Sequence, residues 1–270
     1  GASVRWAEFD PQTGELPSDA VAAVLSPRTR LVAVTAASNL IGTRPPIADI
    51  ARVVHDAGAL LYVDGVHATA HVSVDIGSLG ADLYACSPYK FLGPHCGVAA
   101  GRVELLESLQ PDKLLPATDV VPERFELGTL PYELLAGTTA AVDFLAYAPD
   151  DGGDRRARLV AEMAKIEAHE DGLRHRLEDG LASMPSITSH SHAACRTPTV
   201  LLTFEGRDTA DAPPFLAERN INAPAGSFYA LEPSRWLGLG DTGGLRIGFA
   251  PYNDADDVDR LLTALNDFVS

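Results

Sequence analysis

Two side chains of complementary chemistry, Asp64 and Lys90, stand just past two apolar segments of the sequence. The segment 59–63 (ALLYV) runs directly into Asp64, and the segment 81–86 (ADLYAC) is followed by Ser87 and then by Lys90. Segments of this length and composition are typical of buried parallel strands. Ligands of open α/β sheets bind outside the carboxyl ends of such strands. A carboxylate, a hydroxyl and an amine at one sheet edge suit a cofactor with a basic ring nitrogen, a phosphate and an aldehyde, which is pyridoxal phosphate.

The composition favours a globular protein that binds small molecules. The chain has 270 residues, 46% of them hydrophobic, which is enough for a large core in one or two domains. It carries 21 Lys and Arg against 37 Asp and Glu, for a net charge of -16. This balance opposes nucleic acid or an anionic membrane as the main partner. No apolar run approaches the roughly 20 residues of a membrane span.

Three cysteines, Cys86, Cys96 and Cys195, lie far apart and form no CxxC motif. An odd number of scattered cysteines predicts neither a disulfide framework nor a zinc site, so we expect no metal. Free thiols fit a reducing cytoplasm best.

The order of the expected elements favours an α/β fold with a mostly parallel sheet, followed by a small α+β domain. Residues 1–10 read as a strand with no element before it, so the pattern begins in mid-sheet. The segment 148–154 (APDDGGD) is the predicted boundary between a large domain, 1–150, and a small domain, 151–270. The remaining elements are predicted as strands at 30–35, 59–64, 81–86, 97–101, 199–204 and 245–250, helices at 16–25, 46–57, 131–147, 155–184, 212–219 and 255–269, and loops at 111–126 and 223–226.

Five short motifs follow one another along the chain. They are SNLIGT at 38–43, VDGVH at 63–67, SPYK at 87–90, FELGT at 125–129 and LRIGFAPYN at 245–253. In this order and spacing they resemble class V aminotransferases of the type I pyridoxal-phosphate fold, especially the cysteine desulfurase-like branch. The resemblance covers essentially the whole chain.

The resemblance assigns the central chemistry to two residues. Lys90 matches the lysine that forms a Schiff base with pyridoxal phosphate, which requires an amine neutral enough to be nucleophilic. Asp64 matches the acid that pairs with the pyridine nitrogen and keeps the ring protonated, so that the ring accepts electrons from the substrate. The plain structural alternatives are a surface lysine and a loop or helix-capping aspartate.

The resemblance also implies five further cofactor contacts. His67 stands where desulfurases usually have a glutamine beside the cofactor's phenolic oxygen, and a neutral imidazole can donate the same hydrogen bond. Ser87 matches a phosphate-binding serine, and Tyr89 replaces a histidine that also reaches the phosphate. Asn39 matches a residue near the phenolic oxygen and the substrate. Thr129 matches a threonine that reaches the phosphate of the other subunit, which implies a homodimer with shared active sites.

Arg246 matches the arginine that binds the substrate's α-carboxylate, with Asn39 nearby. A guanidinium fork fits a carboxylate through two parallel hydrogen bonds. A structural ion pair is the alternative for an arginine within an apolar strand.

Two departures from the family pattern stand out. Tyr229 occupies the place of the catalytic cysteine of desulfurases, and no cysteine follows Cys195. Without a thiolate in that place no persulfide forms there, and Cys96 lies on a different loop. Family members also carry about 100 or more residues upstream, as a large domain of ordinary size would. The chain is therefore expected to lack the N-terminal part that holds a phosphate-binding helix end and a group that stacks on the cofactor.

The resemblance thus implies a pyridoxal-phosphate enzyme that acts on an amino acid through Lys90, of the aminotransferase, lyase or epimerase type. Two alternatives stay open from the sequence. One is a true cysteine desulfurase with a displaced cysteine, and the other is a non-catalytic scaffold or binding protein of the same fold.

Overall fold

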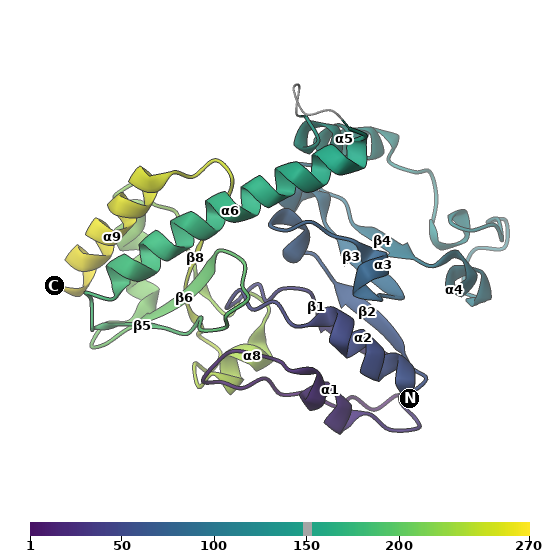
Figure 1. Cartoon of the computed structure of the whole chain (residues 1–270), viewed down its shortest axis with the longest axis horizontal. Coiled ribbons are helices and arrows are strands. Elements are labelled where there is room, and N and C mark those ends of the chain that lie inside the picture. Colours follow the sequence, from purple (N-terminus) through teal and green to yellow (C-terminus); the bar gives the residue numbers. More distant parts are fainter. Residues whose placement is uncertain (148–152) are drawn as a thin grey trace.

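A computed structural model describes residues 1–147 and 153–270, which form two four-stranded sheets (Figure 1). In the first sheet the strands follow the chain order β1-β2-β3-β4, with β1, β2 and β3 parallel and β4 antiparallel. The predicted mostly parallel α/β sheet is thus confirmed. The strands are β1 (Leu31–Thr35), β2 (Leu60–Asp64), β3 (Leu83–Cys86) and β4 (Val98–Gly101).

Helix α2 (Ile47–Asp56), predicted at 46–57, packs against β2, and its apolar spacing explains why the prediction is confirmed. Its buried residues Ile47, Ile50, Ala51 and Val54 recur at helical spacing and form one apolar face. This face joins the side chains of β2 in one hydrophobic core. Two shorter helices belong to the same part of the chain, α1 (Ser18–Val24) and α3 (Ile76–Leu79).

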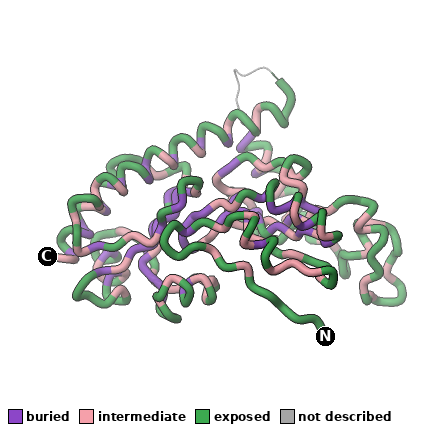
Figure 2. Tube along the Cα trace, turned by 60° about the horizontal axis from the view of Figure 1, so that its bottom comes forward, coloured by how far each residue is buried: buried purple, intermediate pink, exposed green. Residues whose placement is uncertain are grey.

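The predicted strand at 1–10 is wrong, because residues 1–17 contain neither helix nor strand. Val4 and Trp6 are exposed, and no described strand pairs with this segment. A strand without a neighbour has no ladder of hydrogen bonds to hold it. Figure 2 shows the N-terminal segment as a largely exposed trace, while buried residues concentrate in the sheets and the elements that face them.

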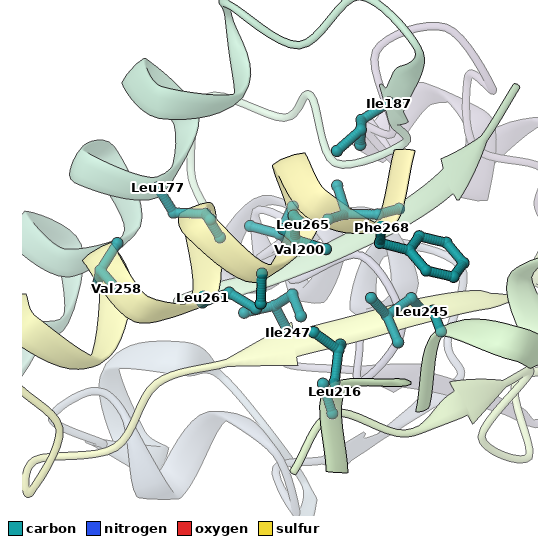
Figure 3. Close-up of a cluster of buried hydrophobic side chains, with 14 of the residues drawn as sticks. Leu177, Ile187, Val200, Leu216, Leu245, Ile247, Val258, Leu261, Leu265 and Phe268 are labelled. Carbon is teal, nitrogen blue, oxygen red and sulfur yellow. The ribbon is translucent and has the colours of Figure 1, made fainter. Parts of the chain in front are cut away.

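The second sheet is antiparallel throughout, in the order β5-β6-β8-β7. Its apolar side chains pack with those of α6 and α9, as Figure 3 shows for Leu177, Val200 and Leu261. The expected strands and helices of this part are confirmed, whereas the short strands β5 and β7 and the helix α8 were missed. The elements are α6 (Arg155–Leu181), β5 (Ile187–Ser189), β6 (Thr199–Phe204), α7 (Ala212–Ala217), β7 (Ala225–Gly226), α8 (Leu231–Trp236), β8 (Gly244–Gly248) and α9 (Ala255–Val269).

Helix α6 connects the two parts of the molecule (Figure 1). It packs on α5 (Tyr132–Leu145) at its start and on α9 further along. Figure 1 also shows the segment between β4 and α5, which includes α4 (Val103–Ser108), extending away from the first sheet. The predicted domain boundary at 150 lies outside the described residues, so the division into two domains stays a prediction. Among the described helices, none combines the length and hydrophobicity that crossing a membrane requires.

Replacing two leucines in adjacent strands tests which strand of the first sheet contributes to the buried core. Leu61 in β2 is fully buried, whereas Leu31 in β1 is 53% exposed. We expect Leu61→Ala to lower the free energy of unfolding by about 2–5 kcal/mol, because it leaves a cavity. The matched control Leu31→Ala should cost less than about 1 kcal/mol. Urea denaturation of both variants measures this, and equal losses would contradict the assignment of β1 to an exposed edge.

Candidate active site

Lys90 lies in a tight turn directly after β3. Strand β3 ends at Cys86, and the 3-10 helix Pro88–Phe91 follows, with the Lys90 amide donating to the Ser87 carbonyl at 3.0 Å. The chain leaves this turn through Leu92, whose φ is +68°, and through Gly93, where a Cβ would come within 2.9 Å of the Pro88 side chain. The turn therefore holds Lys90, half-buried, at the edge of the sheet.

Asp64 is the last residue of β2 and lies at the same edge. Its Oδ1 accepts a hydrogen bond from the Val66 amide at 2.9 Å, and its side chain is exposed. The next residue must be glycine, because a Cβ on Gly65 would lie 2.0 Å from the ring of the buried Tyr84. Tyr84 is fixed in turn by a 2.8 Å hydrogen bond between its hydroxyl and that of Thr69. The close approach of Gly65 to the Tyr84 ring thus fixes the end of β2, and with it the position of Asp64.

Two of the predicted residues, Arg246 and Asp64, act electrostatically on Lys90. The pKa of Lys90 is lowered from its ordinary value, first by burial and then by the positive charge of Arg246, while Asp64 acts in the opposite direction. The structure therefore brings Lys90, Asp64 and Arg246 together from β2, the turn after β3, and β8. A lowered pKa raises the share of neutral amine, which is the nucleophilic form.

Arg246 is a half-buried cation in β8 whose pKa is lowered by burial. Its Nη1 donates to the Asn39 carbonyl at 3.0 Å, and its guanidinium lies 3.8 Å from the centre of the Phe228 ring. No carboxylate pairs with it in the part of the chain that the structure describes. The predicted alternative, a structural ion pair, is therefore not seen among those residues, and the guanidinium is available for an anionic group.

The Asn39 side chain makes a contact that the sequence did not indicate. Its Nδ2 donates to the Phe228 carbonyl at 2.8 Å, so the amide joins the loop after β1 to the loop before α8. Asn39 also lies beside Arg246, through the hydrogen bond to its carbonyl, but the role of this pair in binding substrate stays a prediction. Its contact with the cofactor stays a prediction.

His67 is held by two threonines of the second sheet region. Its Nε2 lies 3.0 Å from both the Thr197 and the Thr199 hydroxyl, and both threonines are buried. The pKa of His67 lies well below its ordinary value, chiefly through burial and further through His71, Lys90 and Arg246. The ring is therefore neutral, as its predicted role requires, but its Nε2 is engaged with protein hydroxyls.

Glu170 and His71 extend this network, and the motifs did not reveal them. His71 stacks edge-on against His67 with ring centres 4.8 Å apart, and its Nδ1 lies 2.8 Å from Glu170 Oε2. The Glu170 side chain is 1% exposed, and burial raises its pKa although His71 opposes the shift. One signal could have found it: Glu170 falls between Ile166 and Leu173 on the buried face of α6.

The side chains predicted to bind the phosphate make no hydrogen bonds that join them to the rest of the candidate site in the described chain. Ser87 is half-buried and Tyr89 is exposed, with its ring stacked on His95 at 5.1 Å. Within the described chain, neither hydroxyl has a hydrogen-bond partner. Thr129 is exposed in the segment before α5, and no hydrogen bond joins it to the other predicted residues described here. A cavity of about 580 Å³, lined in part by Arg44, lies elsewhere and includes none of the predicted site residues.

The loop in the place of the desulfurase cysteine carries aromatic residues instead. Phe228 and Tyr229 both have left-handed backbones, with φ of +53° and +63°, and the Tyr229 side chain is fully exposed. Cys96 contacts the Thr138 hydroxyl at 3.5 Å, and burial raises the pKa of Cys86. A raised pKa keeps the Cys86 thiol protonated, so it is not an activated nucleophile.

Residues 1–261 match the family model described as aminotransferase class-V. The chain belongs to the class V aminotransferase family. This family member is 33% identical over 268 residues to the aminotransferase-like protein FGM3 of Gibberella zeae, covering 96% of the chain and 64% of the relative. It is 31% identical over 288 residues to the cysteine desulfurase CsdA of Escherichia coli, a match that covers 97% of the chain and 67% of CsdA. The chain thus spans about two thirds of the length of these relatives.

Solved structures establish the fold of this family member. A crystal structure of Escherichia coli CsdA in an S-sulfonic acid form superimposes with a TM-score of 0.80 at 30% identity, covering 93% of the chain and 61% of that protein. The apo structure of a cysteine desulfurase from Thermococcus onnurineus superimposes with a TM-score of 0.84 at 24% identity. The match covers 98% of the chain and 66% of that protein. The predicted type I fold of pyridoxal-phosphate enzymes is confirmed, and the structure adds that the C-terminal sheet is antiparallel.

The pKa of His67 predicts a pH-dependent stability. Because the folded protein keeps His67 neutral below the ordinary pKa of 6.5 while the unfolded chain takes up a proton, stability is lost as pH falls through 6.5. His67→Gln keeps a hydrogen-bonding group but cannot titrate. We expect the wild type to lose up to about 1.4 kcal/mol per pH unit relative to this variant below pH 6.5.

Denaturant unfolding of both proteins between pH 7.5 and 5.5 measures this difference. Comparing the two proteins removes the contribution of His190, whose pKa burial also lowers. A constant difference across this range would show that His67 takes up a proton as readily in the folded protein as in the unfolded chain, so that its pKa is not lowered.

Proposed function

We propose that the protein to which this chain belongs is a pyridoxal-phosphate enzyme that acts on an amino acid, with Lys90 as the lysine that carries the cofactor. One observation supports this most directly. Burial and the charge of Arg246 lower the pKa of Lys90, and the carboxylate of Asp64 acts in the other direction. An amine in that setting is matched to nucleophilic and acid–base chemistry.

The polar groups at this edge suit the cofactor. In the described chain, the Lys90 amine and the Ser87 hydroxyl have no hydrogen-bond partner, and the exposed Asp64 carboxylate has one oxygen without a partner. These are a lysine for the aldehyde, a donor for the phosphate and an acid for the ring nitrogen. When bound, pyridoxal phosphate supplies an electron sink that stabilises negative charge at the substrate's α-carbon.

The chain's own residues would then divide the remaining work. Arg246, which has no acid partner among the described residues, would bind the α-carboxylate and fix the orientation of the substrate. The Lys90 amine would take the α-proton, for which a lowered pKa is suited. His67 would act as a neutral group beside the cofactor's phenolic oxygen, and Tyr89 would assist Ser87 at the phosphate.

Of the possible outcomes, we favour transamination, epimerisation or a lyase reaction over cysteine desulfuration. Desulfurases are prominent among the similar proteins, yet Tyr229 stands in the place of the cysteine, and Cys86 has a raised pKa. A non-catalytic scaffold would have no need of a half-buried lysine beside an unpaired arginine. We further expect the cytoplasm as location, because all three cysteines are free thiols.

We propose that the protein acts as a homodimer with shared active sites. Apolar side chains are exposed over the segment between β4 and the end of α5, where a second copy would cover them. Thr129 lies in the same segment, within reach of a partner's site if the copies pair there. The exposed side chains include Val103, Leu114, Leu115, Val120, Leu127, Tyr132 and Phe144.

Replacing Lys90 tests the proposed attachment. We expect Lys90→Ala to abolish covalent retention of pyridoxal phosphate after borohydride reduction of the full-length protein, because the variant lacks the amine. The control Lys113→Ala removes a lysine that is paired with Asp119 and should retain the cofactor as the wild type does. Mass spectrometry after denaturation detects the bound cofactor. Cofactor still fixed to the Lys90 variant would refute the assignment.

A sulfur assay tests the choice between outcomes. We expect the full-length protein to release no sulfide from L-cysteine and to form no persulfide, because no thiol replaces the one absent at Tyr229. Escherichia coli CsdA, assayed in parallel, is the positive control. Turnover that forms a persulfide on Cys96 and disappears in Cys96→Ala would establish a displaced cysteine instead.

A further inference from the structure

The Arg246 guanidinium is held on one face and on one edge by protein groups. Its carbon lies 3.8 Å from the centre of the Phe228 ring, a distance at which the ring covers one face of the flat cation. Its Nη1 donates to the Asn39 carbonyl at 3.0 Å. Nε and Nη2 have no partner in the described part of the chain. The edge formed by Nε and Nη2, which offers two parallel N–H donors, is therefore left for a ligand.

The Phe228 loop is itself fixed in place by several contacts. The Phe228 carbonyl accepts from Asn39 Nδ2 at 2.8 Å, and the Ala230 amide donates to Ser227 at 2.8 Å. Phe228 also packs against the buried cluster of Leu40, Ile41 and Leu201, and Leu201 lies opposite Arg246 in the ladder of β6 and β8. The left-handed backbone at Phe228, φ +53°, is unfavourable for a bulky residue and persists where the surroundings determine it.

Asn39 joins the two halves of this arrangement. Its backbone carbonyl holds Arg246, and its side chain holds the loop that carries the ring. The ring fixes the plane of the guanidinium, and the carbonyl fixes its rotation within that plane. A carboxylate pairs with a guanidinium in plane, through two parallel hydrogen bonds. The free edge consequently has one orientation in which it can accept such a group.

We propose that Phe228 is a positioning residue that makes Arg246 selective for a carboxylate presented in the plane of the guanidinium. The ring excludes an anion from one face, so the α-carboxylate of an amino acid must approach along the free edge. A neutral carboxamide gains little there, because it has a single acceptor and no charge. This inference rests on the proposed function of Arg246, and it adds to it the residue that determines how the carboxylate is bound.

Binding of propionate to the full-length protein tests the inference, with propionamide as the neutral probe. Ligand-observed NMR titration gives both affinities. We expect Phe228→Leu, which keeps apolar bulk but loses the ring face, to weaken propionate binding about tenfold and to leave propionamide unchanged. Phe228→Tyr keeps a ring face and should retain affinity within about twofold. Tyr229→Leu, at the exposed neighbouring position, is the matched control and should bind as the wild type does.

The outcomes separate this inference from the proposed function. If Arg246→Ala loses propionate binding while Phe228→Leu binds normally, the role of Phe228 is refuted and that of Arg246 stands. If Phe228→Tyr is as weak as Phe228→Leu, the ring face is not the cause, and the inference also fails. If Arg246→Ala binds propionate as tightly as the wild type, the carboxylate site itself is refuted. Thermal unfolding of each variant shows that the compared proteins are folded.

Discussion

The parallel register of β2 and β3 is the constraint on which the candidate site depends. Asp64 pairs with Ala85, so both strands end at the same edge, and the turn after β3 holds Lys90 where the Asp64 carboxylate influences its pKa. Gly65 lets the strand end approach the buried Tyr84 ring. A slip in register would separate the acid from the lysine and disturb the packing beneath them.

The site joins the two sheets, because each half supplies groups that the other half lacks. The first sheet region contributes Asp64, Lys90 and Asn39, and the second contributes the cation Arg246. A second set of contacts lies nearby, where His67 meets Thr197 and Thr199 and where His71 meets the buried Glu170. The cost of burying this carboxylate is offset in part by the histidine. The relative placement of the sheets therefore also sets the distance between lysine and arginine.

Family membership and reaction type depend on different residues. The match over residues 1–261, like the lysine, acid and arginine proposed for the site, concerns features that many reactions share. The loop at Phe228 and Tyr229 differs in kind from a loop that presents a thiol, since its ring covers the Arg246 guanidinium and its backbone is tied to Asn39. This contact is one of the observations on which the proposed preference for substrate orientation over sulfur transfer rests.

The sequence by itself determined the strand ends and the residues placed there. Apolar runs of strand length, the helical spacing in α2 and the short polar motifs are local properties, and the positions of Asp64, Lys90 and Arg246 follow from them. Residues 1–10 were misjudged because a strand exists only where another strand pairs with it. Tertiary structure alone decided that His67 meets threonines 130 and 132 residues away and that Asn39 holds Phe228 across 189 residues. Such pairs leave no periodic signal, because they depend on how separate elements pack and not on the chain near either residue.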